Sequence, residues 1–174
     1  MQYKAYYVEE RDGVFSSSIQ SLEIPEPQDG DLLISVSYSS LNYKDALCAT
    51  GVKGVAASYP FVPGIDAVGT VAKSNSDAFH EGDKVICSGY KLGMNTNGGF
   101  GSLICVPADW VVHLPSAMSD FEAMSYGVAG LTSAACVKSI IDKGVVDTLP
   151  IAVSGATGGA VSYTHLTLPT SPKV

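Results

Sequence analysis

Residues 149–159, "LPIAVSGATGG", decide the fold class, because they combine a short apolar strand with a glycine-rich turn. We expect the strand over residues 150–154 and the turn over Gly155–Gly159. A backbone that approaches a pyrophosphate closely needs residues without side chains, and a helix after the turn would offer free N–H groups. The stretch is therefore typical of the start of a dinucleotide-binding unit. Position 161 is Val161 rather than glycine, so an ordinary strand and turn remains open on these residues alone.

The residues after this turn do not continue the pattern. Residues 162–174, "SYTHLTLPTSPKV", are rich in threonine and contain Pro169 and Pro172, so we expect them to oppose a helix. Their wording is that of a translated sequencing adapter or assembly error. We therefore expect a non-native tail on an N-terminal fragment that is inactive by itself and does not bind a dinucleotide. A real short variant is the alternative.

Residues 1–117 have the punctuation of an all-β region. In "DLLISVSYSSLN" (31–42), apolar and small polar side chains alternate with a period of two, which predicts a half-buried strand. Further strands are expected at 67–74, at 82–89 and at 100–115, the last interrupted at 107–109. Strands joined by local turns at this spacing predict a small barrel or sandwich.

The pattern becomes helical after residue 118. Ser119 and Glu122 have the spacing of a capping box, so a helix is expected to start there. Gly127 weakens its continuity, and we expect one short helix to about residue 126 and a second from about 129 to 143, ending at Gly144. The second helix has an apolar face suited to packing on a sheet.

Composition and charge exclude several classes of function. The formal net charge is −7, and no cluster of basic residues appears, which argues against a nucleic-acid partner. We see no apolar run of membrane-spanning length and no apolar signal segment, so we expect no membrane partner and a cytoplasmic location. The widely spaced Cys48, Cys87, Cys105 and Cys136 fit reduced thiols.

Three loop regions could carry chemistry. In "SSLNYKDALCATG" (39–51), the polar group Asn42 to Asp45 follows a strand and could form a site, or Asn42 could simply cap a helix. Asp66 lies in an apolar strand entrance and needs a partner, such as a backbone donor or Lys44. The glycine-rich residues 89–101 could be a mobile loop near a ligand or a plain hairpin connection.

Five segments together resemble one enzyme family, and they are "SSLNYKDAL", "PFVPGIDAVGTV", "GDKVICSGYKLGMNTNGGFGSLICVPADWVV", "EAMSYGVAGLTSAACV" and "LPIAVSGATGG". They resemble the zinc-independent medium-chain dehydrogenase/reductases, in the quinone-oxidoreductase-like branch that includes acryloyl-CoA reductases. The resemblance covers residues 1–159. It implies a β-rich GroES-like catalytic domain (1–118) and the truncated start of an α/β Rossmann domain (119–161), before the tail (162–174).

The resemblance also implies a site. Tyr43 would lie beside the nicotinamide of NADPH, and Thr132 would lie near the same end. Gly155, Thr157, Gly158, Gly159 and Ser162 would meet the phosphates. The choice between NAD and NADP is made about 20 residues after the glycine turn, beyond the residues present.

The implied reaction is NADPH-dependent reduction of an activated C=C bond, in an enoyl-CoA such as acryloyl-CoA, an enone or a quinone. Zinc-dependent relatives have a Gly-His-Glu motif where this chain has Gly64-Ile65-Asp66, and Ile65 cannot ligate a metal, so no metal is expected. Tyr43 could donate a proton or orient the nicotinamide, and we favour orientation. The expected partners are a small-molecule substrate and further copies of the parent chain. The alternative is a non-catalytic GroES-like binding module.

Overall fold

The computed structural model describes residues 1–56, 58–144, 151–155 and 157–167, with side chains up to residue 164. It divides into two compact units, Met1–Ser125 and Tyr126–Val174, and each is described by itself. The elements are β1 (Gln2–Arg11), β2 (Val14–Glu23), β3 (Asp31–Tyr38), α1 (Tyr43–Ala49), β4 (Asp66–Ser74), β5 (Lys84–Ser88), β6 (Leu103–Pro107), a 3-10 turn (Ala108–Trp110), β7 (Val111–His113), α2 (Asp120–Asp142) and α3 (Gly159–Thr167).

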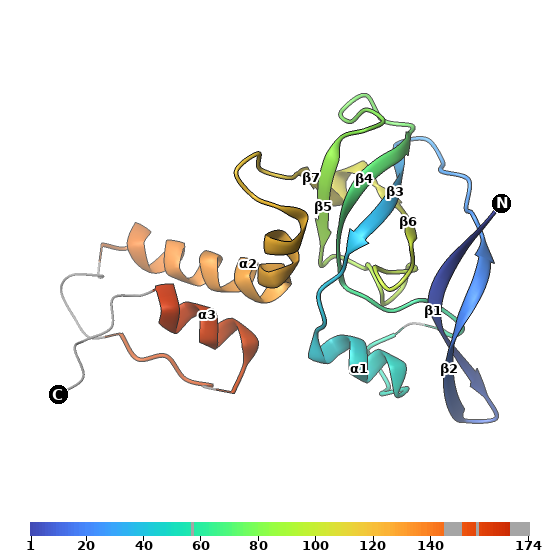
Figure 1. Cartoon of the computed structure of the whole chain (residues 1–174). Helices are drawn as coiled ribbons and strands as arrows, with labels where there is room; N and C mark the ends of the chain where they lie inside the picture. Colours follow the sequence, from blue (N-terminus) through green and yellow to red (C-terminus); the bar gives the residue numbers. More distant parts are fainter. Residues whose placement is uncertain (57, 145–150, 156, 168–174) are drawn as a thin grey trace. The chain divides into compact units, whose positions relative to one another are not determined.

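The first unit is built on two antiparallel sheets (Figure 1). A five-stranded sheet has the order β6-β3-β4-β5-β7, and β1 and β2 form a separate hairpin. The strands expected at 31–42, 67–74, 82–89 and 100–115 are confirmed, including the interruption after Pro107. The hairpin was not predicted as separate strands. The β-rich fold class is therefore confirmed.

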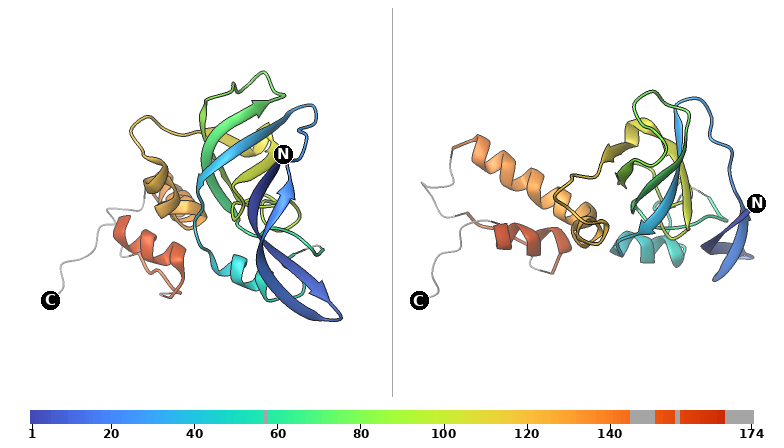
Figure 2. Two further views of the ribbon diagram at one scale, coloured as in Figure 1. Left: turned by 45° about the vertical axis from the view of Figure 1, so that its right-hand side comes forward. Right: turned by 45° about the horizontal axis from the view of Figure 1, so that its top comes forward.

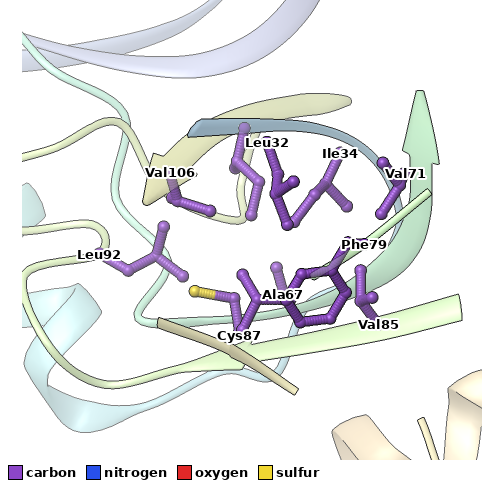
Figure 3. Close-up of a cluster of buried hydrophobic side chains, with 11 residues drawn as sticks. Leu32, Ile34, Ala67, Val71, Phe79, Val85, Cys87, Leu92 and Val106 are labelled. Carbon is purple, nitrogen blue, oxygen red and sulfur yellow. The ribbon is translucent and has the colours of Figure 1, made fainter. Parts of the chain in front are cut away.

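Apolar side chains from the inner face of the curled sheet meet in one core (Figure 3). Leu32 and Ile34 of β3 lie opposite Ala67 of β4 and Val85 of β5, and all four are at most 1% exposed. Burial of a leucine, isoleucine or valine side chain contributes about 1.5–3 kcal/mol, so this core stabilises the sheet that carries the neighbouring loops.

The glycine-rich loop 89–101 is packed tightly rather than left open. A Cβ on Gly93 would lie 2.6 Å from the backbone carbonyl carbon of Gly64, and one on Gly98 would lie 2.3 Å from the Gly64 oxygen. Neither position has room for a side chain. Of the two interpretations, a mobile loop or a hairpin connection, the close packing favours a fixed connection.

Helix α2 consists of two helical pieces, because Gly127 has non-helical dihedral angles (φ 51°, ψ −157°) and breaks the helix. The expected break between two helices is thus confirmed, and the second piece ends within two residues of Gly144. The capping box is also confirmed, because the Ser119 N–H donates to the Glu122 carboxylate at 2.8 Å and the Glu122 N–H donates to the Ser119 hydroxyl at 3.2 Å.

In the second unit, α3 lies alongside α2 (Figures 1 and 2). The Ser133 hydroxyl of α2 donates to the Ala160 carbonyl, and the rings of Tyr126 and Tyr163 lie 5.8 Å apart. Helix α3 corrects the prediction that residues after the glycine turn oppose a helix. Pro169 lies beyond the helix end and outside the described residues, so it does not interrupt the helix.

The prediction of a strand over residues 150–154 is wrong for residues 151–154, which have no regular secondary structure. Residue 150 lies outside the described residues. A strand needs a partner to satisfy its backbone groups, and no neighbouring strand of the second unit is present within its described residues. The local apolar pattern was therefore insufficient.

Within the described ranges, α2 is the one helix long and apolar enough to cross a membrane by length and composition. This is weak evidence, because helices in the cores of soluble proteins meet the same criterion. Gly127 interrupts the helix, which would leave backbone groups unsatisfied in lipid. The absence of a membrane partner stays a prediction.

Candidate functional site

The candidate substrate pocket lies at the beginning of α1 in the first unit. It has a volume of about 750 Å³, which is in the range of small-molecule sites. Its lining includes Leu41, Asn42, Tyr43 and Asp45 from the segment before and within α1, with the aromatic rings of Tyr6 and Phe100. The walls are mainly apolar, with a few polar groups from one segment.

Tyr43 is the first residue of α1, and its side chain is 80% exposed. Leu41, two residues earlier, is 85% exposed. Large apolar groups at this exposure are unusual when they stand close together, and here they border a pocket at the start of α1. The position of Tyr43 therefore suits contact with a flat, partly apolar ligand.

Asn42 is the N-cap that precedes α1, as one of the two interpretations of this segment expected. Its extended backbone (φ −119°, ψ 153°) and the capping box with Asp45 confirm the N-cap. Its side-chain amide also donates to Asp66 at 2.9 Å and to the Ser40 hydroxyl at 2.8 Å. Asn42 consequently caps the helix and also lines the pocket, and the interpretation that this segment forms a site stays a prediction.

Asp66 is fully buried at the start of β4. Its carboxylate accepts hydrogen bonds from the Ser40 hydroxyl and from the Asn42 amide. The partners that sequence reasoning suggested were a backbone donor or Lys44. The structure shows two side chains from the loop before α1, while Lys44 is exposed.

Asp45 is a second buried carboxylate, 1% exposed. It accepts the backbone N–H of Asn42 at 2.8 Å, of Gly64 at 3.2 Å and of Ile65 at 3.0 Å. Burial raises the pKa of this carboxyl, the three backbone donors oppose that rise, and the nearby charge of Asp66 adds to it. Asp45 thus joins the start of α1 to the loop before β4.

The glycine turn belongs to the second unit and feeds α3 directly. Gly155 has a φ of +84°, which residues other than glycine rarely adopt, and its carbonyl accepts the Gly158 N–H at 2.8 Å. Thr157, Gly158 and Gly159 are exposed at the helix start. The turn therefore has the conformation and the accessibility that close approach of a phosphate requires.

The other two predicted cofactor residues lie on helices of the same unit. Ser162 is exposed in the first turn of α3, and its hydroxyl lies 3.5 Å from the Gly158 carbonyl oxygen. Thr132 is exposed on α2, where its hydroxyl donates to the Val128 carbonyl at 2.8 Å and borders a hollow of about 670 Å³. Tyr43 belongs to the first unit and is described with it.

Cysteine, histidine and acidic side chains do not gather into a metal site within the part of the chain that the structure describes. Both oxygens of Asp45 already accept backbone N–H groups. Burial raises the pKa of the Cys87 thiol to about 12 and that of the Cys105 thiol to about 11. Both thiols therefore stay protonated, and a protonated thiol is a poor metal ligand.

Sequence reasoning did not find Tyr6, Phe100 or Ser40 as members of this region. Tyr6 lies on β1, and Phe100 lies in the glycine-rich loop, so only the fold brings them to the pocket. Ser40 could have been suspected from its position before the polar group that begins at Asn42, but serines are common in loops.

Comparison with known proteins places these features in a wider context. The model of the alcohol dehydrogenase GroES-like domain matches residues 28–116. The chain is 39% identical over 160 residues to a probable acrylyl-CoA reductase AcuI of Escherichia coli, a match that covers 91% of this chain and 49% of the relative. It is 45% identical over 134 residues to a putative quinone oxidoreductase YhfP of Bacillus subtilis, covering 76% of this chain and 40% of the relative.

Solved structures agree with the sequence comparison. The yhdH oxidoreductase of Salmonella enterica, in complex with NADP, superposes with a TM-score of 0.86 at 39% identity, over 92% of this chain and 50% of that one. The Bacillus subtilis yhfP protein with NAD bound gives a TM-score of 0.87 at 36% identity, over 94% and 50%. The chain thus spans about half the length of the curated relatives it matches.

Proposed function

Because the chain belongs to the medium-chain dehydrogenase/reductases through their alcohol dehydrogenase GroES-like domain, we propose that it serves NADPH-dependent reduction of an activated C=C bond. The substrate is an enoyl-CoA such as acryloyl-CoA, or an enone or quinone. The observation that carries this proposal is the apolar pocket bordered by the exposed Tyr43, in a domain whose similar proteins are named as such reductases.

The cofactor would supply the hydride, and the residues of this chain would bind and orient. Tyr43 can lie against a flat ring because its phenol is exposed at the pocket edge. Leu41 and Phe100 line the same pocket and would give a bound alkene an apolar surface to lie against. We assign Tyr43 to orientation rather than to proton donation, because solvent can reach the same edge and deliver the proton to the enolate.

The glycine turn fits the phosphates of a dinucleotide. The positive φ of Gly155 and the exposed start of α3 would let the backbone N–H groups approach an anion. Gly158, Gly159, Thr157 and Ser162 would hold the pyrophosphate, and Thr132 would lie towards the nicotinamide. NADPH rather than NADH is supported by the NADP-bound Salmonella relative, although the Bacillus relative has NAD bound.

Zinc has no role in the proposed reaction. Ile65 offers no donor atom beside Asp66, and the carboxylate of Asp66 accepts hydrogen bonds from Ser40 and Asn42. The Asp45 carboxylate is engaged by three backbone N–H groups. A zinc ion would have to displace these donors and still find a third ligand.

The test uses the protein expressed from its complete reading frame. NADPH oxidation is followed by absorbance with acryloyl-CoA, with an enone and with a quinone, and the saturated product is identified by mass spectrometry. Elemental analysis should find no stoichiometric zinc, and a chelator should leave the rate unchanged. If the protein showed neither turnover nor NADPH binding, the proposal would be contradicted and a non-catalytic binding module would be favoured.

A further inference from the structure

Asp66 is held rigidly beside the segment from Ser40 to Asp45, which is called the pocket segment. It is the first residue of β4, pairs with Ser88 of β5 in the ladder and is fully buried. Its backbone carbonyl also accepts the Ser39 hydroxyl at 2.7 Å. A carboxylate in this position is fixed by the sheet and offers a stationary acceptor to the loop that precedes α1.

The Ser40 hydroxyl and the Asn42 amide both donate to the same oxygen of Asp66, Oδ2. A carboxylate accepts and cannot donate, so the Asn42 amide must turn its NH₂ group towards Asp66. The second N–H of the same group donates to the Ser40 hydroxyl oxygen, and that hydroxyl spends its own proton on Asp66. The reversed amide would set its carbonyl oxygen against a buried carboxylate, so the Asn42 side chain has one orientation.

The fixed Asn42 determines where α1 begins. This helix has seven residues, which is too short to be stable by itself in water, so its direction depends on tertiary contacts. Tyr43 follows Asn42 directly, and its side chain is 80% exposed, so little packing of its own holds it. The backbone at Asn42, which Asp45 also holds through the Asn42 N–H, therefore sets the point from which the Tyr43 side chain extends.

From this chain of contacts we propose that Asp66 is a positioning residue, which acts through Asn42 to hold Tyr43 at the pocket edge. The proposal rests on the proposed reductase function, since Tyr43 is assigned there to orientation. Asp66 itself touches neither substrate nor cofactor in this scheme. What it supplies is the acceptor that the Asn42 amide needs, and this polarity can be reversed experimentally.

The test is an exchange of the two groups in the protein from the complete reading frame. Asn42→Asp sets two carboxylates against each other, and Asp66→Asn buries an amide with unmatched donors. Each single change should lower kcat about 10- to 100-fold, the effect of misplacing a positioning group by about 1 Å. The double variant restores one donor and one acceptor, and its kcat should exceed that of either single variant. Independent losses that simply multiply would overturn the proposal.

A second measurement does not depend on turnover. Ring-labelled tyrosine is followed by NMR, and the Tyr43 signal is assigned by its loss in Tyr43→Phe. The signal should shift or broaden in each single variant and return towards its original position in the double variant. Asp83→Asn is the matched control, because its carboxylate accepts the backbone N–H of His80 in a turn between β4 and β5, and it should leave the signal unchanged.

The two measurements separate the two ideas. If the unaltered protein does not oxidise NADPH with any substrate, the proposed function fails, and the Tyr43 signal still decides whether Asp66 positions it. If the protein is active and folded but the Tyr43 signal is the same in Asp66→Asn and Asn42→Asp, the positioning role is refuted.

Discussion

Replacing Asp45 by alanine should destabilise the first unit strongly. The carboxylate is 1% exposed and accepts the N–H groups of Asn42, Gly64 and Ile65. A buried donor left without an acceptor costs about 1–3 kcal/mol. Three such donors would cost about 3–9 kcal/mol, but removal of the buried charge relieves the desolvation that raises the Asp45 pKa. We therefore expect a loss of about 3 kcal/mol, at the lower end of that range.

Urea unfolding measures this loss. Trp110 is the only tryptophan of the chain and stacks on Tyr90 in the same unit as Asp45, so its fluorescence reports the unfolding of that unit. The control is Asp31→Ala, whose carboxylate accepts the Gln28 N–H in an exposed hydrogen bond at the start of β3. The control should lose about 1 kcal/mol or less. If Asp45→Ala lost no more than the control, the assignment of three buried donors to Asp45 would be wrong.

Three further variants test the site and the fold. Tyr43→Phe should weaken the free energy of NADPH binding by about 1–2 kcal/mol in a fluorescence titration, the value of one hydrogen bond. A loss of turnover with unchanged binding would show proton donation instead. Gly155→Ala should weaken NADPH binding about tenfold in the same titration, because alanine would shift the turn away from a φ of +84° and recovering that conformation for the phosphates costs about 1–2 kcal/mol, and unchanged affinity would count against the turn. The hydrogen bond from Lys84 holds the Asp120 pKa below its ordinary 3.8. The ionised Asp120 therefore contributes to the stability of the fold above pH 3.8, and this contribution is lost as the pH falls through the folded-state pKa. Asp120→Asn should thus flatten the acid limb of the unfolding curve, and an unaltered limb would contradict this.

The β-rich unit was predictable because its signals are local. Alternation in residues 31–42 and turn residues between the strands define elements whose burial follows from a period of two. The capping box at Ser119 and the break at Gly127 are local as well, since both depend on backbone geometry within four residues. Elements of this kind form where their own residues favour them.

The rest depended on contacts that no local pattern contains. Asp66 accepts hydrogen bonds from Ser40 and Asn42, which lie 26 and 24 residues earlier in the chain. Helix α3 forms although threonine is a weak helix former, and the Thr164 hydroxyl donates back to the Ala160 carbonyl at 2.8 Å. The Ser133 hydroxyl of α2 donates to the same carbonyl, so contact with α2 supports the helix. Propensity alone gave the wrong answer there.

The two buried carboxylates explain how an apolar domain can hold a polar site in place. Leu32 and its neighbours stabilise the sheet through apolar burial, which has no direction and cannot orient a loop. Hydrogen bonds to Asp45 and Asp66 are directional, and they connect the start of α1 to residues 64–66. The pocket segment is therefore held by a different kind of force from the sheet that supports it. It follows that a substitution in this network can displace Tyr43 while the core stays intact, whereas a cavity in the core lowers the stability of the whole unit.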